Sequence, residues 1–184
     1  SMDAKQRMTF TPLPHFARGV WSGGPNLPDP KLGWVILNNM GGHAGNDQQH
    51  ATIRRWIAPT DGVYTINGFI HHPSMEGDGV RGRIVSSRAG VVASWDVQNR
   101  RQDANVVSVE LKKGDTLDFV ADCRTNPNND SFQWETTIRR GSDGVTWESK
   151  RDFRGTREVI AAALTPWEQY AQVLLLANEF AFVD

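Results

Sequence analysis

The sequence has few of the residues and patterns on which disulfide frameworks, zinc sites and membrane spans depend. Its 184 residues include one cysteine, Cys123, which excludes an intrachain disulfide and a cysteine-rich zinc site. No apolar run approaches the roughly 18 residues that a membrane-spanning helix needs. Lysine and arginine (20) balance aspartate and glutamate (21), and the net charge of -1 argues against a general nucleic-acid-binding or anionic membrane-binding surface. The length suffices for one domain with a hydrophobic core of its own.

Catalytic signatures are also missing. There is no Gly-x-Ser-x-Gly nucleophile elbow, and the glycine-rich segment 41–47 lacks the Lys-Ser/Thr of a phosphate-binding loop. A turn-rich connector is the favoured interpretation of that segment, and the alternative is a loop whose backbone approaches a partner closely. His71 and His72 are adjacent, so in a strand they point to opposite faces and do not jointly bind one metal ion. Asp118 and Asp122 are too generic a pair to indicate glycoside hydrolysis. The sequence therefore predicts a protein that is not an enzyme.

What the chain does contain is a series of short segments rich in β-branched and aromatic residues, each ended by a turn signal such as Pro59-Thr60-Asp61-Gly62. Eight strands are predicted, at residues 34–37, 51–58, 63–71, 80–87, 91–97, 106–111, 116–123 and 131–139. Their near-regular spacing without intervening helices predicts an all-β fold, an antiparallel β-sandwich of the jelly-roll type.

The two ends differ from this central part. Ser1-Met2 is typical of the remnant left when an expression tag is removed, and prolines and glycines make the first fifty residues irregular. Residues 165–168 (Thr-Pro-Trp-Glu) form a helix start with threonine as the N-cap, and the helix is predicted to reach about Asn178. Trp147 and Phe153 indicate that the preceding segment packs on the sandwich. We therefore expect an irregular N-terminal segment (1–30), a β-sandwich domain (31–140), and an extended segment with a C-terminal α-helix packing on the sandwich (141–184).

The most unusual feature is aromatic, because seven tryptophans stand against two tyrosines. Tryptophan packs in hydrophobic cores and also stacks on flat ligand faces, so each of these rings has to be assigned either to the framework or to a binding site. Alternation along the strands places Trp134 in the core, and we expect Trp34 to join it. Helical spacing gives Trp167 a packed position, while Trp21 and Trp147 lie in segments predicted to cover the sandwich. Framework thus accounts for most of the tryptophans.

Trp56 and Trp95 remain as platforms for a ligand. Alternation places Trp56 on an outer sheet face that carries charges of both signs. The charged residues predicted on that face are Arg54, Arg81, Arg83, Asp118 and Asp122. One interpretation is cross-strand ion pairing on a solvated sheet that the N-terminal loops or the C-terminal helix cover. The other is a binding face, where guanidinium and carboxylate groups bond sugar hydroxyls beside an indole, and where arginine captures sulfate or carboxylate groups.

A second location for a site is the ends of the strands. Trp95, His43 and the loop 75–79 are the candidate contacts there, while Trp56, Arg54, Arg81, Arg83 and Asp118 are the candidates on the sheet face. The sequence does not choose between the two locations.

Two polar loops could hold calcium, the only cofactor that the residues suggest. Glu76 and Asp78 lie in the first loop, and residues 126–130 form the second. Neither loop has the spacing of an EF-hand, so solvent-exposed turn residues remain the favoured interpretation. The residues that would bind a metal are left open.

Several motifs occur in an order that resembles a known group of proteins. They are Gly33-Trp34, Gly41-Gly42-His43-x-Gly45, Arg54-Arg55-Trp56-x-Ala58-Pro59-x-Asp61-Gly62, Gly77-Asp78-Gly79-Val80-Arg81, Val85-Ser86-Ser87-Arg88, Gly114-Asp115-Thr116-Leu117-Asp118-Phe119, Asp130-Ser131-Phe132-x-Trp134 and the ending 164–184. From about residue 20 the chain resembles the C-terminal part of large exported planctomycetal proteins that carry cytochrome-c-like and uncharacterised domains upstream. The strand portion separately resembles the galactose-binding-like jelly rolls used as carbohydrate-binding modules.

These resemblances imply a function and a location. They imply a non-catalytic carbohydrate-binding module of a larger exported bacterial protein, in an extracellular, periplasmic or cell-envelope setting, with polysaccharide or oligosaccharide as partner and acidic or sulfated polysaccharide as one candidate. The alternative is a structural or protein-interaction domain that docks onto upstream domains of its parent. No nucleic acid and no membrane span are expected. With Cys123 as its one cysteine, this chain cannot attach a c-type haem.

Overall fold

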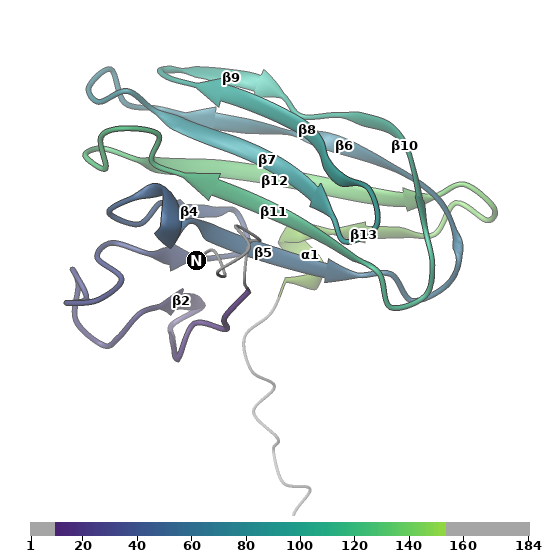
Figure 1. Cartoon of the computed structure of the whole chain (residues 1–184), viewed down its shortest axis with the longest axis horizontal. Coiled ribbons are helices and arrows are strands. Elements are labelled where there is room, and N and C mark those ends of the chain that lie inside the picture. Colours follow the sequence, from purple (N-terminus) through teal and green to yellow (C-terminus); the bar gives the residue numbers. More distant parts are fainter. Residues whose placement is uncertain (1–9, 154–184) are drawn as a thin grey trace, which may run out of the picture.

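Two antiparallel β-sheets packed face to face form the body of the molecule in the computed structural model, which describes residues 10–153 (Figure 1). The larger sheet has the order β1 (His15–Ala17), β2 (Val20–Ser22), β3 (Ile36–Leu37), β4 (Gly41–His43), β12 (Ser131–Arg140), β6 (Gly62–His72), β10 (Val106–Leu111), with β13 (Thr146–Glu148) beside β12 and β9 (Arg100–Asp103) beside β6. The smaller sheet has the order β5 (Thr52–Ile57), β11 (Thr116–Asp122), β7 (Val80–Ser86), β8 (Gly90–Val97). Two short helices are η1 (Gln48–His50) and α1 (Ser149–Asp152).

Eight of these strands have the connectivity of a jelly roll. The eight are β4, β5, β6, β7, β8, β10, β11 and β12, taken as first to eighth along the chain. One sheet then reads first, eighth, third, sixth, and the other reads second, seventh, fourth, fifth. This order confirms the predicted all-β sandwich, and the remaining strands extend the larger sheet.

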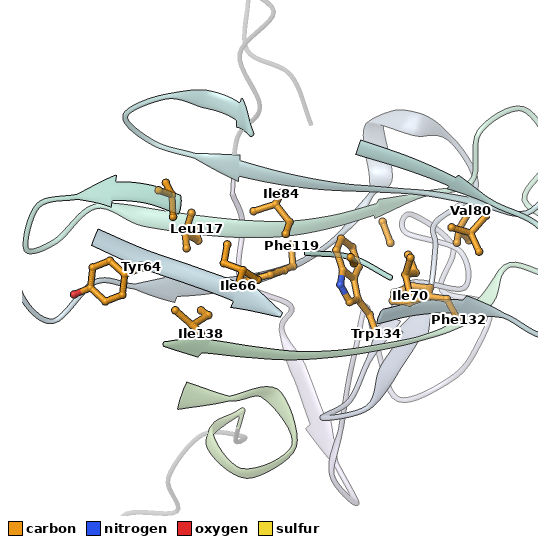
Figure 2. Close-up of a cluster of buried hydrophobic side chains, with 14 of the residues drawn as sticks. Tyr64, Ile66, Ile70, Val80, Ile84, Leu117, Phe119, Phe132, Trp134 and Ile138 are labelled. Atoms are coloured by element: carbon orange, nitrogen blue, oxygen red, sulfur yellow. The ribbon is translucent and has the colours of Figure 1, made fainter. Parts of the chain in front are cut away.

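The hydrophobic core fills the space between the two sheets (Figure 2). Trp134 of β12 is 2% exposed, and its ring meets Phe119 of the opposite sheet edge to face at 5.7 Å. Tyr64 of β6 is fully buried, and its hydroxyl donates to the Thr60 carbonyl at 2.7 Å, so its one polar atom is satisfied. The predicted core position of Trp134 is confirmed.

Seven predicted strands agree with the observed ones to within one residue at each end, but the segment 34–37 does not. Only Ile36–Leu37 forms a strand there, and Trp34 is 44% exposed. The expectation that Trp34 joins the core is therefore wrong. Val35 and Leu37 are the buried residues of this segment, so the side chain of Trp34 falls on the other side of the alternation.

The glycine-rich segment also differs from expectation. Part of the predicted turn-rich connector is strand β4, the first strand of the jelly roll. A Cβ atom at Gly41 would lie 2.0 Å from the Phe132 carbonyl oxygen, and one at Gly42 would lie 2.2 Å from the Ile36 carbonyl oxygen. The two glycines are therefore needed because neighbouring strands approach closely here. A prediction based on turn propensity interprets such glycines as part of a loop.

The described part of the chain ends at Phe153, shortly after α1. The predicted helix 165–178 and the packed position of Trp167 lie outside the described residues. The division of the chain at residues 30 and 140 stays a prediction. Among residues 10–153, no helix has both the length and the apolarity that a membrane crossing requires.

Candidate functional site

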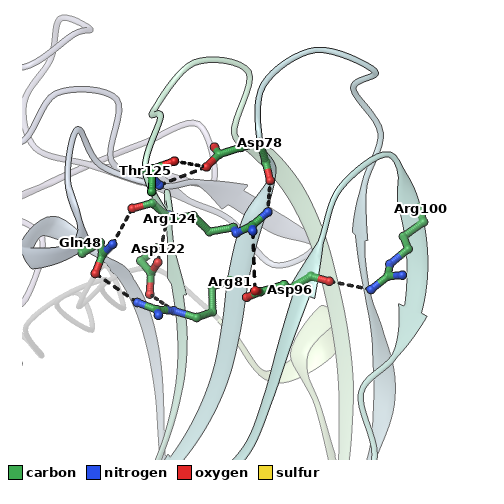
Figure 3. Close-up of polar contacts among 8 residues, drawn as sticks. All are labelled: Gln48, Asp78, Arg81, Asp96, Arg100, Asp122, Arg124 and Thr125. Carbon is green, nitrogen blue, oxygen red and sulfur yellow. Dashed lines mark hydrogen bonds and ion pairs between the residues drawn. The ribbon is translucent and has the colours of Figure 1, made fainter.

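The outer face of the smaller sheet carries cross-strand ion pairs (Figure 3). Asp118 accepts from Arg55 Nε and Nη2, both at 2.7 Å, and the two residues are direct partners in the β11–β5 register. Asp122, also on β11, accepts from Arg81 Nε at 3.1 Å and from Arg83 Nη2 at 2.9 Å. The cross-strand ion pairs expected under the first interpretation, a solvated and partly covered sheet, are therefore present on this face. Three predicted ligand contacts, Arg81, Arg83 and Asp118, belong to this network.

Part of this face is also covered. The Phe10 ring lies 4.0 Å from the Arg55 guanidinium, so the N-terminal segment packs on the sheet where that arginine pairs with Asp118. Covering by N-terminal residues was part of the first interpretation.

Strand β5 has the opposite orientation to the predicted one. Arg54 and Trp56 face the sandwich interior, and Arg55 is the arginine on the outer face. The predicted grouping of Arg54 and Trp56 with Arg81, Arg83 and Asp118 is therefore wrong. The sequence Thr52–Ile57 has no clean polar and apolar alternation, so the strand pattern alone does not fix its register.

Arg54 reaches from one sheet across the interior to the other. Its Nη1 donates to the Trp134 carbonyl at 2.9 Å, and its Nη2 donates to the Asn38 carbonyl at 2.8 Å. Trp134 lies on the edge of β12 between the stretch that pairs with β4 and the stretch that pairs with β13. Arg54 is 7% exposed, and burial lowers its pKa to about 10, so the guanidinium remains charged at neutral pH. It thereby satisfies backbone carbonyls that no neighbouring strand reaches.

A pocket of about 90 Å³ opens beside this arginine, between β5 and the β13–α1 segment. Aromatic rings dominate its lining, and Trp56 and Trp147 meet edge to face at 5.3 Å. Phe153 also lines it, with its ring 4.9 Å from the Arg54 guanidinium. The pocket therefore offers indole and phenyl surface next to a fixed positive charge.

Two polar atoms of residues that line the pocket are buried. Arg54 Nε is a donor, and Thr136 Oγ1 can donate or accept; neither has a hydrogen-bond partner among residues 10–153. Glu148 and Asp152 add carboxylates to the lining. Apolar ring surface together with polar side chains is a lining that suits small hydroxylated ligands.

A second, polar groove of about 220 Å³ lies on the outer side of the larger sheet. Its charged groups are paired, since Lys150 Nζ lies 3.0 Å from Glu135 Oε1 and Arg151 Nη1 lies 3.3 Å from Glu148 Oε1. The Arg101 guanidinium lies 3.4 Å from the centre of the Phe69 ring, which also lines the groove, and covers one face of that ring. The pocket beside Arg54 is therefore the stronger candidate.

The remaining predicted contacts lie elsewhere. Trp95 of β8 packs against Trp134 at 6.4 Å with nearly perpendicular rings, at the margin of the core. His43 of β4 is half-buried, its Nδ1 lies 2.6 Å from the Ala44 carbonyl oxygen, and burial lowers its pKa. Of the seven candidates, the structure brings only Arg54 and Trp56 to one pocket.

Most of the lining residues were missed by sequence reasoning, and Trp147, Phe153 and Thr136 are the ones that matter for the site. Trp147 and Phe153 carried a signal, because they are aromatic residues in an otherwise charged segment. Thr136 lies on the same face of β12 as the core residues, so the alternation pattern predicts that it points inward. The pattern does not show that its hydroxyl has no partner among the described residues.

The loops at one end of the sandwich bury a carboxylate. Asp130, interpreted as an exposed turn residue, is 0% exposed, so that interpretation is wrong for this position. Burial, and then the charge of Asp78, raise the pKa of Asp130 to about 7. Burial also raises the pKa of the nearby Cys123 thiol to about 11, which keeps it neutral and consistent with a small buried apolar residue. Within residues 10–153, no group of three or more His, Cys, Asp or Glu side chains is placed to hold a metal ion.

Comparisons with known proteins give one result. No protein-family model matches the sequence, and no curated protein matches it. Among solved structures the chain is similar to a family 35 carbohydrate binding module from an environmental isolate, with 14% identity, a TM-score of 0.34, and coverage of 68% of this chain and 82% of that one. A TM-score of 0.34 carries no argument about function, so the proposal below rests on the residues of this chain. The planctomycetal resemblance and the cytochrome-c association gain no support and stay predictions.

Proposed function

We propose that this chain is a non-catalytic carbohydrate-binding module, and that the pocket beside Arg54 is its binding site. The observation that carries the proposal is the combination of the Trp56 and Trp147 rings with polar and charged side chains in one pocket lining, among them Arg54 and Glu148. Sugars present apolar CH faces and a ring of hydroxyls, and these two kinds of surface match the two parts of the lining.

The size of the pocket limits what it can take. Sites that enclose a drug-sized ligand measure roughly 300–1,000 Å³, and this one measures about 90 Å³. We therefore expect it to receive one edge of a sugar ring or a substituent, with the rest of the glycan outside.

The charges around the pocket bear on which glycan binds. Glu148 and Asp152 line it and both pair with Arg151, and together with Arg54 these charges balance, so the pocket has no net positive charge to attract a sulfate or uronate group. We expect neutral glycans to bind in the pocket. An acidic or sulfated polysaccharide would instead be expected at Arg81 and Arg83 on the outer sheet face.

Affinity electrophoresis in gels with neutral or sulfated polysaccharides tests this proposal. The wild-type chain should be retarded by at least one neutral polysaccharide, and Trp147→Ala should lose most of that retardation because it removes one wall of the pocket. Trp34→Ala is the matched control, since it deletes an exposed indole outside the pocket and should migrate as the wild type does. The pocket proposal fails if no polysaccharide retards the wild-type chain, or if Trp147→Ala is retarded as strongly as Trp34→Ala.

The second candidate function is a structural or interaction domain that docks onto upstream domains of an exported parent protein. One observation favours it: the described segment 146–153 already packs on the sandwich, since β13 pairs with β12 and the Thr136 N–H donates to Ser149 Oγ at 3.1 Å. A variant that lacks residues 158–184 should then melt at a lower temperature than the full chain, because apolar surface would be uncovered. An unchanged melting temperature would contradict packing of that segment on the sandwich.

A further inference from the structure

The smaller sheet ends in a strand that has one side unpaired. In the order β5, β11, β7, β8 the last strand is β8, and within residues 10–153 no strand pairs with its other side. An unpaired edge presents a row of backbone N–H and C=O groups that a further strand can bond. The direction of these groups decides which residues of β8 are available for pairing.

The hydrogen bonds of β7 fix that direction. The Ser87 N–H, at the end of β7, donates to the Thr116 carbonyl of β11 at 3.0 Å. Bonding alternates along an antiparallel strand, and β7 keeps one register with β11 over its whole paired length. Arg83 and Arg81 therefore also bond β11 through their backbone groups, and the residues between them bond β8.

Ser94 and Asp96 of β8 are the partners of Arg83 and Arg81. Because those arginines bond β11, Ser94 and Asp96 turn their backbone N–H and C=O groups toward the free edge. One contact agrees with this direction, since Arg100 Nη2 donates to the Asp96 carbonyl at 2.7 Å (Figure 3). Arg100 thus covers one of the four outward groups of these two residues.

Strand β8 also has few of the features that discourage pairing at an edge. It contains no proline, lysine or arginine, and Asp96 is its one charged residue. At the opposite edge of the same sheet, β5 carries the inward-pointing charge of Arg54. In the larger sheet, the edge strand β10 changes register between Val106 and Val109, and the edge strand β1 has only three residues. Among the described strands, β8 is therefore the edge most open to pairing.

We propose that β8 pairs with β8 of a second copy of this chain, antiparallel and about a two-fold axis at Trp95. In this register Ser94 lies opposite Asp96 of the second copy, and the two residues exchange both of their backbone hydrogen bonds. The residues involved, 93–97, are the part of β8 that pairs with β7 without a register shift. The two smaller sheets then form one continuous sheet across the dimer.

The charges on the outer sheet face favour a second copy in this register. Arg83 is the neighbour of Ser94 in β7, and Asp96 of the second copy adjoins Ser94 on its other side. A guanidinium and a carboxylate from different copies therefore fall in one cross-strand row. Like charges do not meet across the axis, because Asp96 is the one charged residue of β8 and lies opposite Ser94.

The interface is a narrow strip, and Arg100 has to release the Asp96 carbonyl, so we expect a weak dimer that dissociates on dilution. The Arg54 pocket lies beside β5, at the opposite edge of the smaller sheet, and stays open in the dimer. The inference is therefore independent of the carbohydrate proposal. If both hold, the dimer presents two pockets to one polysaccharide.

Analytical ultracentrifugation of the full chain tests for this dimer. The weight-average mass should rise from the monomer value at about 10 µM toward the dimer value at about 1 mM, as a small interface predicts. Ser94→Pro removes an outward N–H and places a ring at the edge, so it should stay monomeric over this range. Ser94→Ala is the matched control, because it keeps the backbone donor and should associate as the wild type does.

Amide hydrogen exchange of the unmodified chain keeps the proposal testable if Ser94→Pro does not fold. The Ser94 and Asp96 amides should exchange about threefold or more slowly at about 1 mM than at about 10 µM. The Ile57 amide, on the opposite edge of the sheet, should exchange alike at both concentrations.

Three results would overturn the dimer. The first is a mass that stays monomeric at every concentration, and the second is association that a folded Ser94→Pro variant retains. The third is exchange at Ser94 and Asp96 that does not depend on concentration. Slow exchange at both concentrations would show that the chain covers this edge itself.

Discussion

Arg54 and Arg55 are neighbours in the sequence but do different work. Arg54 crosses the interior and bonds two backbone carbonyls, whereas Arg55 pairs with Asp118 on the outer face. Both residues are arginines, and they differ only in the side of strand β5 on which their side chains lie. A prediction that assigns the wrong side of this strand to the interior therefore takes the buried arginine for a surface residue, and the surface arginine for a buried one.

The two arginines should differ in their contribution to stability. Arg54→Met leaves two backbone carbonyls without their donor and should lower the free energy of unfolding by about 2–4 kcal/mol. Arg55→Met leaves the Asp118 carboxylate, which is 8% exposed, without its partly exposed bidentate partner and should lower the free energy of unfolding by about 1–2 kcal/mol. Urea unfolding of both variants measures the difference, and equal losses would show that the assigned directions of the two side chains are wrong.

Asp130 should make the stability of the protein depend on pH. Its pKa is raised to about 7 by burial, so the folded chain holds a proton that the unfolded chain has released. Stability should therefore fall as pH rises from about 5 to 8, and Asp130→Asn should remove that part of the fall. Urea unfolding in EDTA across this range is the measurement. Parallel curves for wild type and variant would contradict a proton on Asp130.

At the scale of the elements, β4 shows what sequence patterns miss. Its sequence, Gly41–His43, has almost no side-chain signal for a strand, yet β4 lies between β3 and β12. The other strands were predictable because β-branched and aromatic residues fill them. The short strands β1, β2, β9 and β13 were also missed, because each has only three or four residues, too few to show an alternating pattern.

Close approach at β4 leads to a prediction about glycine. Gly42→Ala should destabilise the protein by about 1–3 kcal/mol, because the new Cβ would meet a backbone carbonyl at 2.2 Å. Gly62→Ala is the control, since its Cβ would meet only side-chain atoms at 3.5 Å or more. Melting temperatures of the two variants give the test. A loss at Gly62 as large as that at Gly42 would rule out the steric explanation.

The candidate site was less predictable than the fold. Trp56 and Arg54 were identified as candidates, but on the wrong face, and the pocket exists only because β13 and α1 bring Trp147 and Phe153 to them. Such a meeting of segments about ninety residues apart leaves no local pattern. The β-sandwich, in contrast, is predicted by the spacing of the strands and the turn signals between them.

In the whole molecule, some tryptophans pack in the core between the sheets and others line the candidate pocket. Trp134 and Trp95 hold the two sheets together at one part of the core, while Trp56 and Trp147 border the pocket at another. The central claim is that this second pair contacts sugar, and the indole N–H signals of the protein report on each ring separately.

Nuclear magnetic resonance of the ¹⁵N-labelled chain during titration with a glycan tests that claim most directly. Trp→Phe variants assign the indole signals, and the glycan is the neutral one that retards the protein most in affinity gels. The account predicts that the signals of Trp56 and Trp147 move with saturation while those of Trp34 and Trp134 stay in place. Movement of Trp34 alone, or no movement of any indole signal, would contradict it.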